Sequence, residues 1–247
     1  MLGERETATD VARLLQERGF IALFVGGCVR DKMLGLAPCD YDVATNAPLD
    51  AVEALITPLA QGVPTRGTNY PVAKFNINGH KIDVTSLKNG SILDDSNRRD
   101  FTMNAMYEDP ISGRLYDLLG GADDMKRGVL RGVGDVVAHM KDDRRRMLRA
   151  PRFAARFGYT IDDAVWNASN QCAEMVREID PEWVAKECRS MAQGSFMHMA
   201  WSFLVFTGVL KYLPAALVEE CFTRHGIGEP QPGHEMARGG HLLQSCG

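Results

Sequence analysis

Two short runs of the chain hold side chains that could handle a metal ion and phosphate. Asp40 and Asp42 are one residue apart, and Gly26, Gly27 and Arg30 precede them. We expect both aspartates to project from one face of a strand, because residues i and i+2 share a face. Paired carboxylates suit Mg²⁺, and a glycine turn lets backbone N–H groups approach phosphate. The pattern favours metal-assisted phosphoryl transfer, although a tight turn followed by turn-capping aspartates would look similar.

A third carboxylate, that of Asp83, is expected close to this pair. Asn78-Gly79 separates two alternating runs, at residues 73–77 and 80–85, and this pattern predicts a β-hairpin. Asp83 lies on the polar face of the second arm and is a candidate catalytic residue. Taken alone, a strand aspartate is more often only solvated.

The second candidate set lies in the run Arg-Arg-Asp-Phe-Thr-Met-Asn-Ala at residues 98–105. Its arginines, Arg99 among them, can neutralise phosphate. Asp100 and Asn104 are four residues apart, the spacing of one helix face. Without other motifs, a basic surface turn followed by a capped helix would explain this run equally well.

The third set is a run of charged residues at 142–156. At about 100° per residue, five arginines fall within an arc of about 120° on a helix. An aspartate can accept from a base amino group and an arginine can donate to ring acceptors, so this helix could select a nucleotide. A salt-bridged exposed face is the alternative. The set comprises Asp143, Arg145, Arg146, Arg149, Arg152 and Arg156.

Hydrophobic patterning divides the chain into an α/β front and a helical back. It predicts strands at 20–25 and 41–44, a short helix from 31 and a helix over 50–59. Helical spacing then recurs at 140–157, 162–178, 181–192 and 196–210. We therefore expect an α+β protein with a head at 1–139, a helical neck at 140–215 and a poorly ordered tail at 216–247.

Composition narrows the class of protein. The chain has 247 residues, 45% of them hydrophobic, and a net charge of −4, as in ordinary globular proteins. Between Lys126 and Arg156 the sequence has ten Lys and Arg and three Asp. This local positive charge favours a confined polyanion site over a generally cationic protein. Lys126 and Arg131 are candidate RNA contacts, together with Arg145 and Arg156, unless the run is a solvated helix face.

Cysteine usage and hydropathy indicate where the protein works. The six cysteines show no C-x-x-C spacing and are expected to be reduced thiols. We see no apolar leader at the N-terminus and no apolar run that could span a membrane. A cytoplasmic location is expected, with an organelle matrix left open.

Three runs, in this order, resemble the class II tRNA nucleotidyltransferase (CCA-adding enzyme)/poly(A) polymerase family: GGCVRDKMLGLAPCDYD, RRDFTMNA and DDRRRMLRAPRFAARFGYTID. The resemblance extends from about residue 20 to residue 213. It implies a polymerase-β-like nucleotidyltransferase head with a small mixed sheet and an all-helical neck.

The resemblance also implies roles for the candidate residues. Asp40 and Asp42 would bind two Mg²⁺ ions, and the glycine turn with Arg30 would contact the triphosphate. The second and third sets would bind the nucleotide. Members of the family add C, C and A to tRNA 3′ ends from CTP and ATP, or polyadenylate RNA.

The chain departs from the family pattern in four ways. Asp142-Asp143 replaces Glu-Asp, and Pro151 lies inside the selecting helix, where proline removes a hydrogen bond and is expected to produce a kink. The segment after Lys88 is short, which favours addition of CC over CCA. The body and tail domains are absent or reduced to residues 219–247, so a protein partner or a homo-oligomer could replace them. A poly(A) polymerase and a weakly active RNA-binding subunit are the alternatives.

Overall fold

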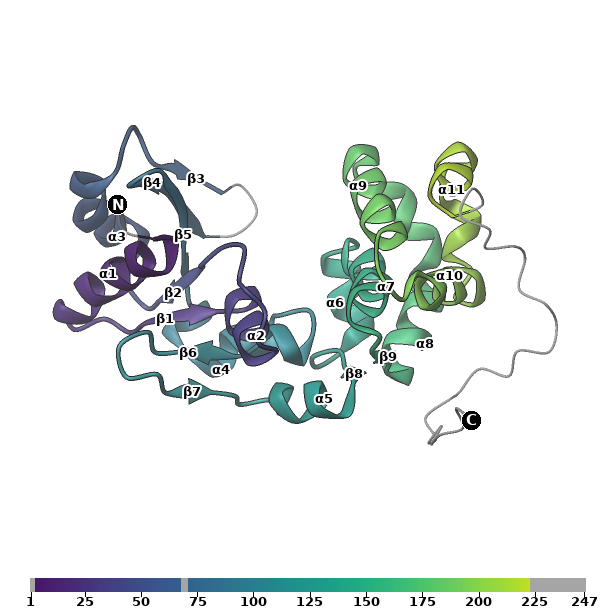
Figure 1. Cartoon of the computed structure of the whole chain (residues 1–247), viewed down its shortest axis with the longest axis horizontal. Helices are drawn as coiled ribbons and strands as arrows, with labels where there is room; N and C mark the ends of the chain where they lie inside the picture. The colour runs from purple at the N-terminus through teal and green to yellow at the C-terminus, as the bar shows by residue number, and fades with distance from the viewer. Residues whose placement is uncertain (1–2, 68–70, 223–247) are drawn as a thin grey trace. The chain divides into compact units, whose positions relative to one another are not determined.

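The computed structural model describes residues 3–67 and 71–222, and Figure 1 shows it in cartoon form. The chain forms two compact units, unit 1 from Met1 to Asp123 and unit 2 from Asp124 to Gly247. Each unit is described by itself below. The helix α5 (Gly121–Arg127) crosses the division between them.

Unit 1 is built around a mixed sheet whose strands follow the order β3-β4-β5-β2-β1-β6-β7. Neighbours β2 and β5 are parallel, and the other pairs in this sheet are antiparallel. The strands are β1 (Ala22–Val25), β2 (Val43–Thr45), β3 (Thr65–Arg66), β4 (Val72–Ile77), β5 (His80–Ser86), β6 (Tyr107–Glu108) and β7 (Leu115–Tyr116).

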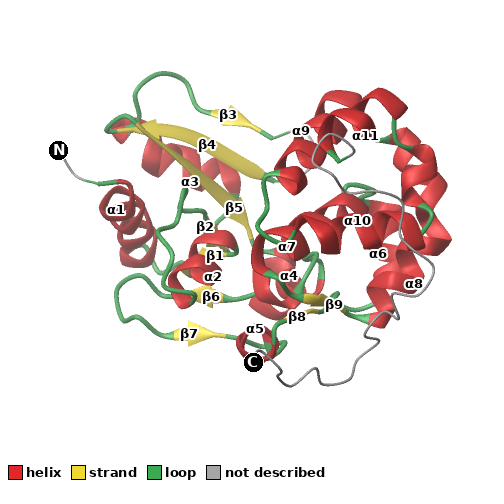
Figure 2. Ribbon diagram, turned by 45° about the vertical axis from the view of Figure 1, so that its right-hand side comes forward, coloured by secondary structure: helices red, strands yellow, loops and turns green. Residues whose placement is uncertain are grey.

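Helices cover this sheet and connect its strands (Figure 2). They are α1 (Glu4–Glu17), α2 (Gly27–Met33), α3 (Leu49–Ile56) and α4 (Ile92–Asn97), with the 3₁₀ turns η1 (Thr57–Leu59), η2 (Lys88–Gly90) and η3 (Thr102–Asn104). In α1 the buried residues Val11, Ala12 and Leu15 recur at helical spacing and form the apolar stripe that packs on the sheet.

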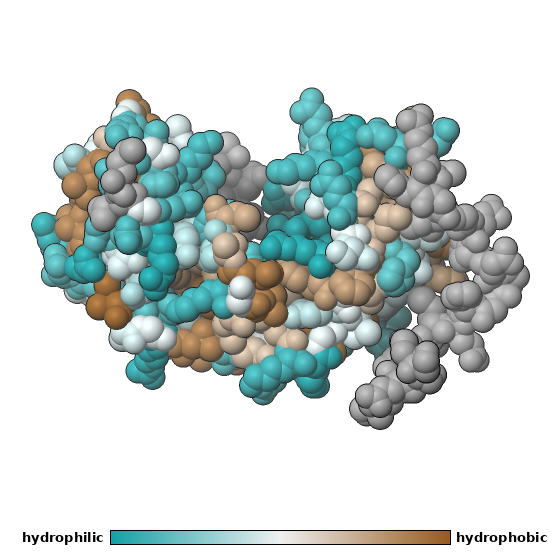
Figure 3. Space-filling model, viewed as in Figure 1, coloured by the Kyte–Doolittle hydropathy of each residue, from teal (hydrophilic) through white to brown (hydrophobic). Residues whose placement is uncertain are grey.

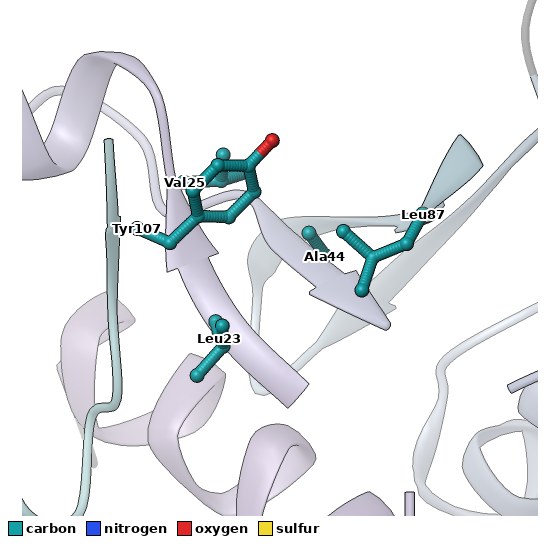
Figure 4. Close-up of a cluster of buried hydrophobic side chains, with 5 residues drawn as sticks. All are labelled: Leu23, Val25, Ala44, Leu87 and Tyr107. Atoms are coloured by element: carbon teal, nitrogen blue, oxygen red, sulfur yellow. The ribbon is translucent and has the colours of Figure 1, made fainter. Parts of the chain in front are cut away.

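The centre of the sheet is fully buried, which explains why its sequence is continuously apolar. All four residues of β1 are buried, as expected for a strand covered on both faces. Figure 4 shows one cluster of this core, in which the ring of Tyr107 lies beside Val25 and points its hydroxyl away from Leu23. Ala44 and Leu87 complete the cluster.

The predicted β-hairpin is confirmed. Strands β4 and β5 pair in antiparallel register up to Ile77 and His80. Asn78 and Gly79 form the turn with φ of 54° and 82°, the left-handed conformation that this dipeptide adopts readily. The apolar arm residues Ile82 and Val84 are buried, so Asp83 between them faces the other side of the sheet.

Unit 2 is almost entirely helical. Its helices are α6 (Val136–Asp142), α7 (Arg146–Phe157), α8 (Asp163–Cys172), α9 (Pro181–Ala192), α10 (Met197–Phe206) and α11 (Ala215–Cys221), with the 3₁₀ segments η4 (Ala173–Glu178) and η5 (Val209–Tyr212). A two-stranded parallel pair, β8 (Val129–Leu130) with β9 (Thr160–Ile161), completes it. The central helix α7 packs against α9 and α10. A methyl group on Gly194 would lie 2.5 Å from the carbonyl oxygen of Ala155, so only glycine permits this packing.

The predicted domain limits differ from the two units. Residues 124–139, placed in the head by the prediction, pack within unit 2 because β8 pairs with β9 and α6 packs on α8. Residues 216–221, placed in a poorly ordered tail, belong to α11, which the ion pair between Glu220 and Arg189 joins to α9 at 2.7 Å. The rest of the predicted tail, 223–247, lies outside the described residues.

The predicted fold class is confirmed as a mixed sheet with helices followed by an all-helical part. One predicted helix is wrong in its extent, because residues 140–157 break between α6 and α7. The break occurs at Asp143, whose extended backbone ends α6, and helical hydrogen bonding resumes at Arg145. Pro151 does not interrupt α7, a helix of 12 residues that extends on both sides of the proline.

The surface carries both polar and apolar regions. On the face shown in Figure 3, hydrophilic side chains gather over α9, and apolar ones reach the surface near α2. Large hydrophobic side chains exposed at or just after α2 are Met33 and Leu36. Within residues 3–67 and 71–222, every helix is too short or too polar to span a lipid bilayer.

Candidate nucleotidyl-transfer site

The three predicted carboxylates lie near one another where β2 begins beside the middle of β5. Val43 of β2 is level with Val84 of β5, so Asp42 and Asp83 occupy the positions just before this pair. The aspartate pair precedes β2 rather than lying in it, contrary to the predicted strand at 41–44. The carbonyl oxygen of Asp42 still accepts from the Val25 N–H at 3.1 Å, which fixes Asp42 against β1.

Negative charge accumulates around Asp42. Burial, and then the nearby charges of Asp40 and Asp83, raise the pKa of its carboxyl to about 7, against the opposing effect of Arg99 and Lys74. Carboxylates in such a group disfavour one another's ionised forms. A divalent cation would remove this repulsion, and its preferred ligands are carboxylate oxygens, so the Asp40–Asp42 pair fits Mg²⁺.

Asp83 has a partner of its own. Its Oδ2 accepts from Lys74 Nζ at 2.5 Å, across the paired positions of β4 and β5. Among the described residues, no three or more His, Cys, Asp or Glu side chains form a ready-made metal-ion ligand group. The structure therefore places Asp83 beside the aspartate pair and leaves its catalytic role a prediction.

The glycine turn lies next to the aspartates, between β1 and α2. Gly26 has φ of 75° and ψ of −121°, a conformation that favours glycine, and its N–H donates to the Met106 carbonyl at 3.2 Å. A Cβ on Gly27 would lie 4.0 Å from Asp40 Oδ1. The turn therefore lies against Asp40 and the Arg30 guanidinium, whose Nη2 would lie 3.7 Å from the same Cβ.

Arg30 is only 5% exposed and belongs to a buried polar network. Its Nε donates to Asp31 Oδ1 at 2.8 Å, and its Nη1 donates to Asn104 Oδ1 at 2.7 Å. The Asn104 amide in turn donates to Asp100 Oδ1 at 3.0 Å. Asp100 and Asn104 thus meet as predicted, although through the 3₁₀ turn η3 rather than an α-helix.

Arg99 is anchored by two groups that the sequence analysis did not select. Its Nε and Nη2 donate to Asp95 Oδ2 at 3.2 and 3.0 Å, and its Nε also donates to the Tyr107 hydroxyl at 3.1 Å. Its Nη1 reaches the Asn104 carbonyl at 3.5 Å and lies 3.3 Å from the position of a Cβ on Gly26. The structure therefore brings Arg99 to the glycine turn.

In unit 2, the carboxylate of Asp143 is hydrogen-bonded to its neighbour Arg145. Asp143 accepts from Arg145 Nε and Nη2 at 2.8 and 2.9 Å, because the chain turns at Asp143 instead of continuing as a helix. Burial works against ionisation of Asp143, but the Arg145 hydrogen bonds and the charges of Arg145 and Arg146 lower its pKa. Arg146 itself is 7% exposed.

The other arginines of α7 differ in their surroundings. Arg152 Nε donates to Glu187 Oε2 of α9 at 2.5 Å, and both side chains are largely buried. The guanidinium of Arg149 lies 5.5 Å from the centre of the Phe153 ring, and exposed Arg156 lies 4.7 Å from that of Phe157. These arginines share α7 as predicted, with Arg152 committed to an internal ion pair.

Two of the candidate RNA contacts, Lys126 and Arg131, lie near α5 and β8. Lys126 is exposed near the end of α5. Arg131 follows β8 and pairs with the fully buried carboxylate of Asp124 at 2.7 Å, and Arg127 pairs with the same carboxylate. A partly exposed basic group surrounds Asp124, and the nucleic-acid role of Lys126 and Arg131 stays a prediction.

Sequence reasoning overlooked several anchoring residues. Asp95 precedes Arg98 and Arg99 by three and four residues, a helical spacing that could have revealed it. Tyr107 and Glu187 contact their arginines only through the tertiary fold and left no local signal.

Comparisons with known proteins agree with this architecture. Residues 22–131 match the family model of the poly A polymerase head domain. The chain is 32% identical over 237 residues to a CC-adding tRNA nucleotidyltransferase of Halalkalibacterium halodurans, covering 94% of this chain and 62% of that protein. A CCA-adding enzyme of Leuconostoc mesenteroides is 34% identical over 229 residues, covering 86% of this chain and 56% of that protein.

Solved structures resemble the fold as well. The CCA-adding enzyme of Bacillus stearothermophilus in complex with CTP matches with a TM-score of 0.77 and 30% identity, over 87% of this chain and 55% of that one. The Thermotoga maritima CCA-adding enzyme complexed with tRNA matches with a TM-score of 0.72 at 24% identity, over 83% of this chain and 51% of that one, a likeness of fold. The chain thus spans little more than half the length of the relatives it matches. The head-domain match shows that residues 22–131 belong to the poly A polymerase head-domain family, and the relatives show that the chain as a whole is similar to tRNA nucleotidyltransferases.

Proposed function

We propose that the protein adds nucleotides to RNA 3′ ends without a template, with tRNA as its acceptor and CTP, and ATP where A is added, as its substrates. The observation that carries this proposal is the assembly of the aspartate pair, the glycine turn and Arg99 at one edge of the unit 1 sheet. Relatives named for CC and CCA addition support the choice of tRNA and of these nucleotides.

In this reaction the terminal 3′ hydroxyl oxygen bonds to the α-phosphorus of the nucleotide, and the bond from that phosphorus to the pyrophosphate oxygen breaks. The hydroxyl proton passes to water. The glycine turn, Arg30 and Arg99 would hold the triphosphate, because backbone N–H groups and guanidinium groups bind phosphate oxygens. The buried Asp31–Arg30–Asn104–Asp100 network keeps this side of the site rigid.

Asp40 and Asp42 would hold two Mg²⁺ ions. Bound there, the ions would lower the pKa of the attacking hydroxyl and stabilise the leaving pyrophosphate. The carboxylates suit this task, since they lie beside the turn that would hold the triphosphate.

Unit 2 would select the base. Asp143 is ionised and can accept from the amino group of cytosine or adenine, while Arg146 and Arg149 can donate to ring acceptors. Arg152 would support this helix through Glu187. The exposed Arg156 and Lys126, with Arg145 and Arg131, would contact the RNA backbone.

The segment after β5 favours CC addition. It forms η2 and α4 within ten residues and is held by the Ser91 cap and by Asp95, which accepts from the Lys88 N–H at 3.2 Å. Members of the family that add the terminal A carry a longer flexible loop here. A compact, anchored segment leaves little room for that movement.

The test uses purified protein, Mg²⁺, each nucleoside triphosphate in turn and a tRNA lacking CCA, with products separated by length. We expect two C residues to be added from CTP. Efficient addition of A to a tRNA ending in CC would overturn the CC-only form of the proposal. Long A tails on a generic RNA would show a poly(A) polymerase instead, and RNA binding without any transfer would show a binding subunit.

A further inference from the structure

A fully buried carboxylate joins three parts of unit 1. Asp95 is 0% exposed and lies in α4. It accepts from Arg98 Nε at 2.6 Å, from Arg99 Nη2 at 3.0 Å and from the Tyr107 hydroxyl at 2.5 Å, besides the Lys88 N–H. One side chain therefore ties the segment after β5 to the 98–105 motif and to β6.

The hydrogen bonds have a defined direction. Burial, with a contribution from Asp95 and against the opposing charge of Arg99, raises the pKa of Tyr107 to about 12, so the phenol keeps its proton and donates a hydrogen bond to Asp95. Burial opposes ionisation of Asp95, but Arg99, the Tyr107 hydroxyl and Arg98 lower its pKa. The phenol oxygen is then available to accept from Arg99 Nε.

This arrangement fixes one edge of the Arg99 guanidinium. Nε and Nη2 are held by Asp95 and Tyr107, and the ring of Tyr107 lies 5.3 Å from the Arg99 Cζ. The remaining nitrogen, Nη1, is directed toward the Asn104 carbonyl and the Gly26 turn. Because a guanidinium is planar, holding one edge determines where the other nitrogen lies.

We propose that Asp95 and Tyr107 are positioning residues that set the Arg99 guanidinium at the glycine turn for binding the nucleotide triphosphate. This inference rests on the proposed function. It assigns to Tyr107 a role that its burial in the core of the sheet conceals (Figure 4), since its ring packs in the apolar cluster while its hydroxyl leaves that cluster.

The main variant is Tyr107→Phe, which keeps the ring and removes only the hydroxyl. We expect the KM for CTP to rise about three- to tenfold with a smaller change in kcat, because the charge of Arg99 remains but its position is less defined. Asp95→Asn, which keeps the side-chain shape, should change the KM in the same direction. The matched control is Tyr116→Phe, on the paired position of neighbouring β7, which should leave KM unchanged.

A double-mutant cycle separates positioning from mere structural support. In an Arg99→Lys background, Tyr107→Phe should no longer affect KM, because the group that it positions is gone. An effect of equal size in both backgrounds, or a lowered melting temperature with an unchanged KM, would overturn the inference.

Direct titration of CTP into the protein without RNA separates this inference from the proposed function. If the wild type binds CTP but transfers nothing, the proposed function fails, and a Tyr107→Phe loss of CTP affinity still supports positioning. If the wild type transfers nucleotides and Tyr107→Phe behaves like Tyr116→Phe, only the inference fails. A wild type that binds no CTP would overturn both.

Discussion

The start of β2 in unit 1 and the surroundings of α7 in unit 2 both concentrate charged side chains, but the charges are balanced differently in the two regions. In unit 1 the carboxylates at the strand ends repel one another, and the pKa of Asp42 is raised to about 7 by burial and by Asp40 and Asp83. Around α7 of unit 2 the carboxylates have arginine partners, as Asp143 has Arg145 and Glu187 has Arg152. Because these carboxylates in unit 1 repel one another, we expect a cation to bind beside them.

The same comparison limits what the arginines of unit 2 can do by themselves. A guanidinium that neutralises a buried carboxylate cannot leave it without a large cost, since the carboxylate would stay buried and unpaired. Arg152 therefore supports the packing of α7 on α9 first. We therefore expect nucleotide selection to depend on the side chains nearer the start of α7.

The largest expected effect, on nucleotide transfer, comes from removing the carboxylate of Asp42 in unit 1. Asp42→Asn should reduce nucleotide transfer about a thousandfold or more, because it removes a ligand of the ions that stabilise the transition state. It should not lower the melting temperature, because a carboxylate whose ionisation is disfavoured contributes no stabilising charge. Gel analysis of C addition and a thermal melt measure both.

The control for this variant is Asp163→Asn, an exposed aspartate of α8. It removes the same charge from unit 2 and should leave transfer intact. Retention of transfer by Asp42→Asn would show that the metal pair has been assigned incorrectly.

An intermediate effect, on stability, is expected from breaking the Arg152–Glu187 ion pair of unit 2. Glu187→Gln should destabilise the protein by about 3 kcal/mol, because it leaves the Arg152 charge buried without its partner. Denaturant unfolding measures this loss. The control Glu174→Gln breaks the exposed pair with Arg177 and should change stability little. A Glu187→Gln protein as stable as the wild type would contradict a supporting role for the pair.

The smallest effect concerns the exposed end of α7. Arg156→Gln should leave stability nearly unchanged and reduce the slope of log tRNA affinity against log salt concentration by about one, as expected for one phosphate contact. Binding measured at several salt concentrations checks this. The control Arg5→Gln changes an exposed arginine of unit 1 and should leave the slope unaltered. Equal slopes for Arg156→Gln and the wild type would show that Arg156 does not contact RNA.

Local sequence patterns predicted much of the site. The Asp-x-Asp spacing, the glycine pair and the Asn-Gly hairpin depend on neighbours within a few residues, and the structure brings these elements together at one sheet edge. The break at Asp143 was missed because the helical periodicity of 140–157 is strong on both sides of it. The extended backbone and Arg145 pair at Asp143 replace the helical geometry there.

The sequence by itself determined the family resemblance, the order of the elements and the residue types of the site, because motifs and periodicity are local properties of the chain. Only the tertiary structure decided which charges are compensated. Arg152 meets Glu187 of another helix, and Arg99 meets Tyr107 of β6. Such pairings depend on strand register and helix packing, which bring distant residues within 3 Å or so, and no spacing along the chain encodes them.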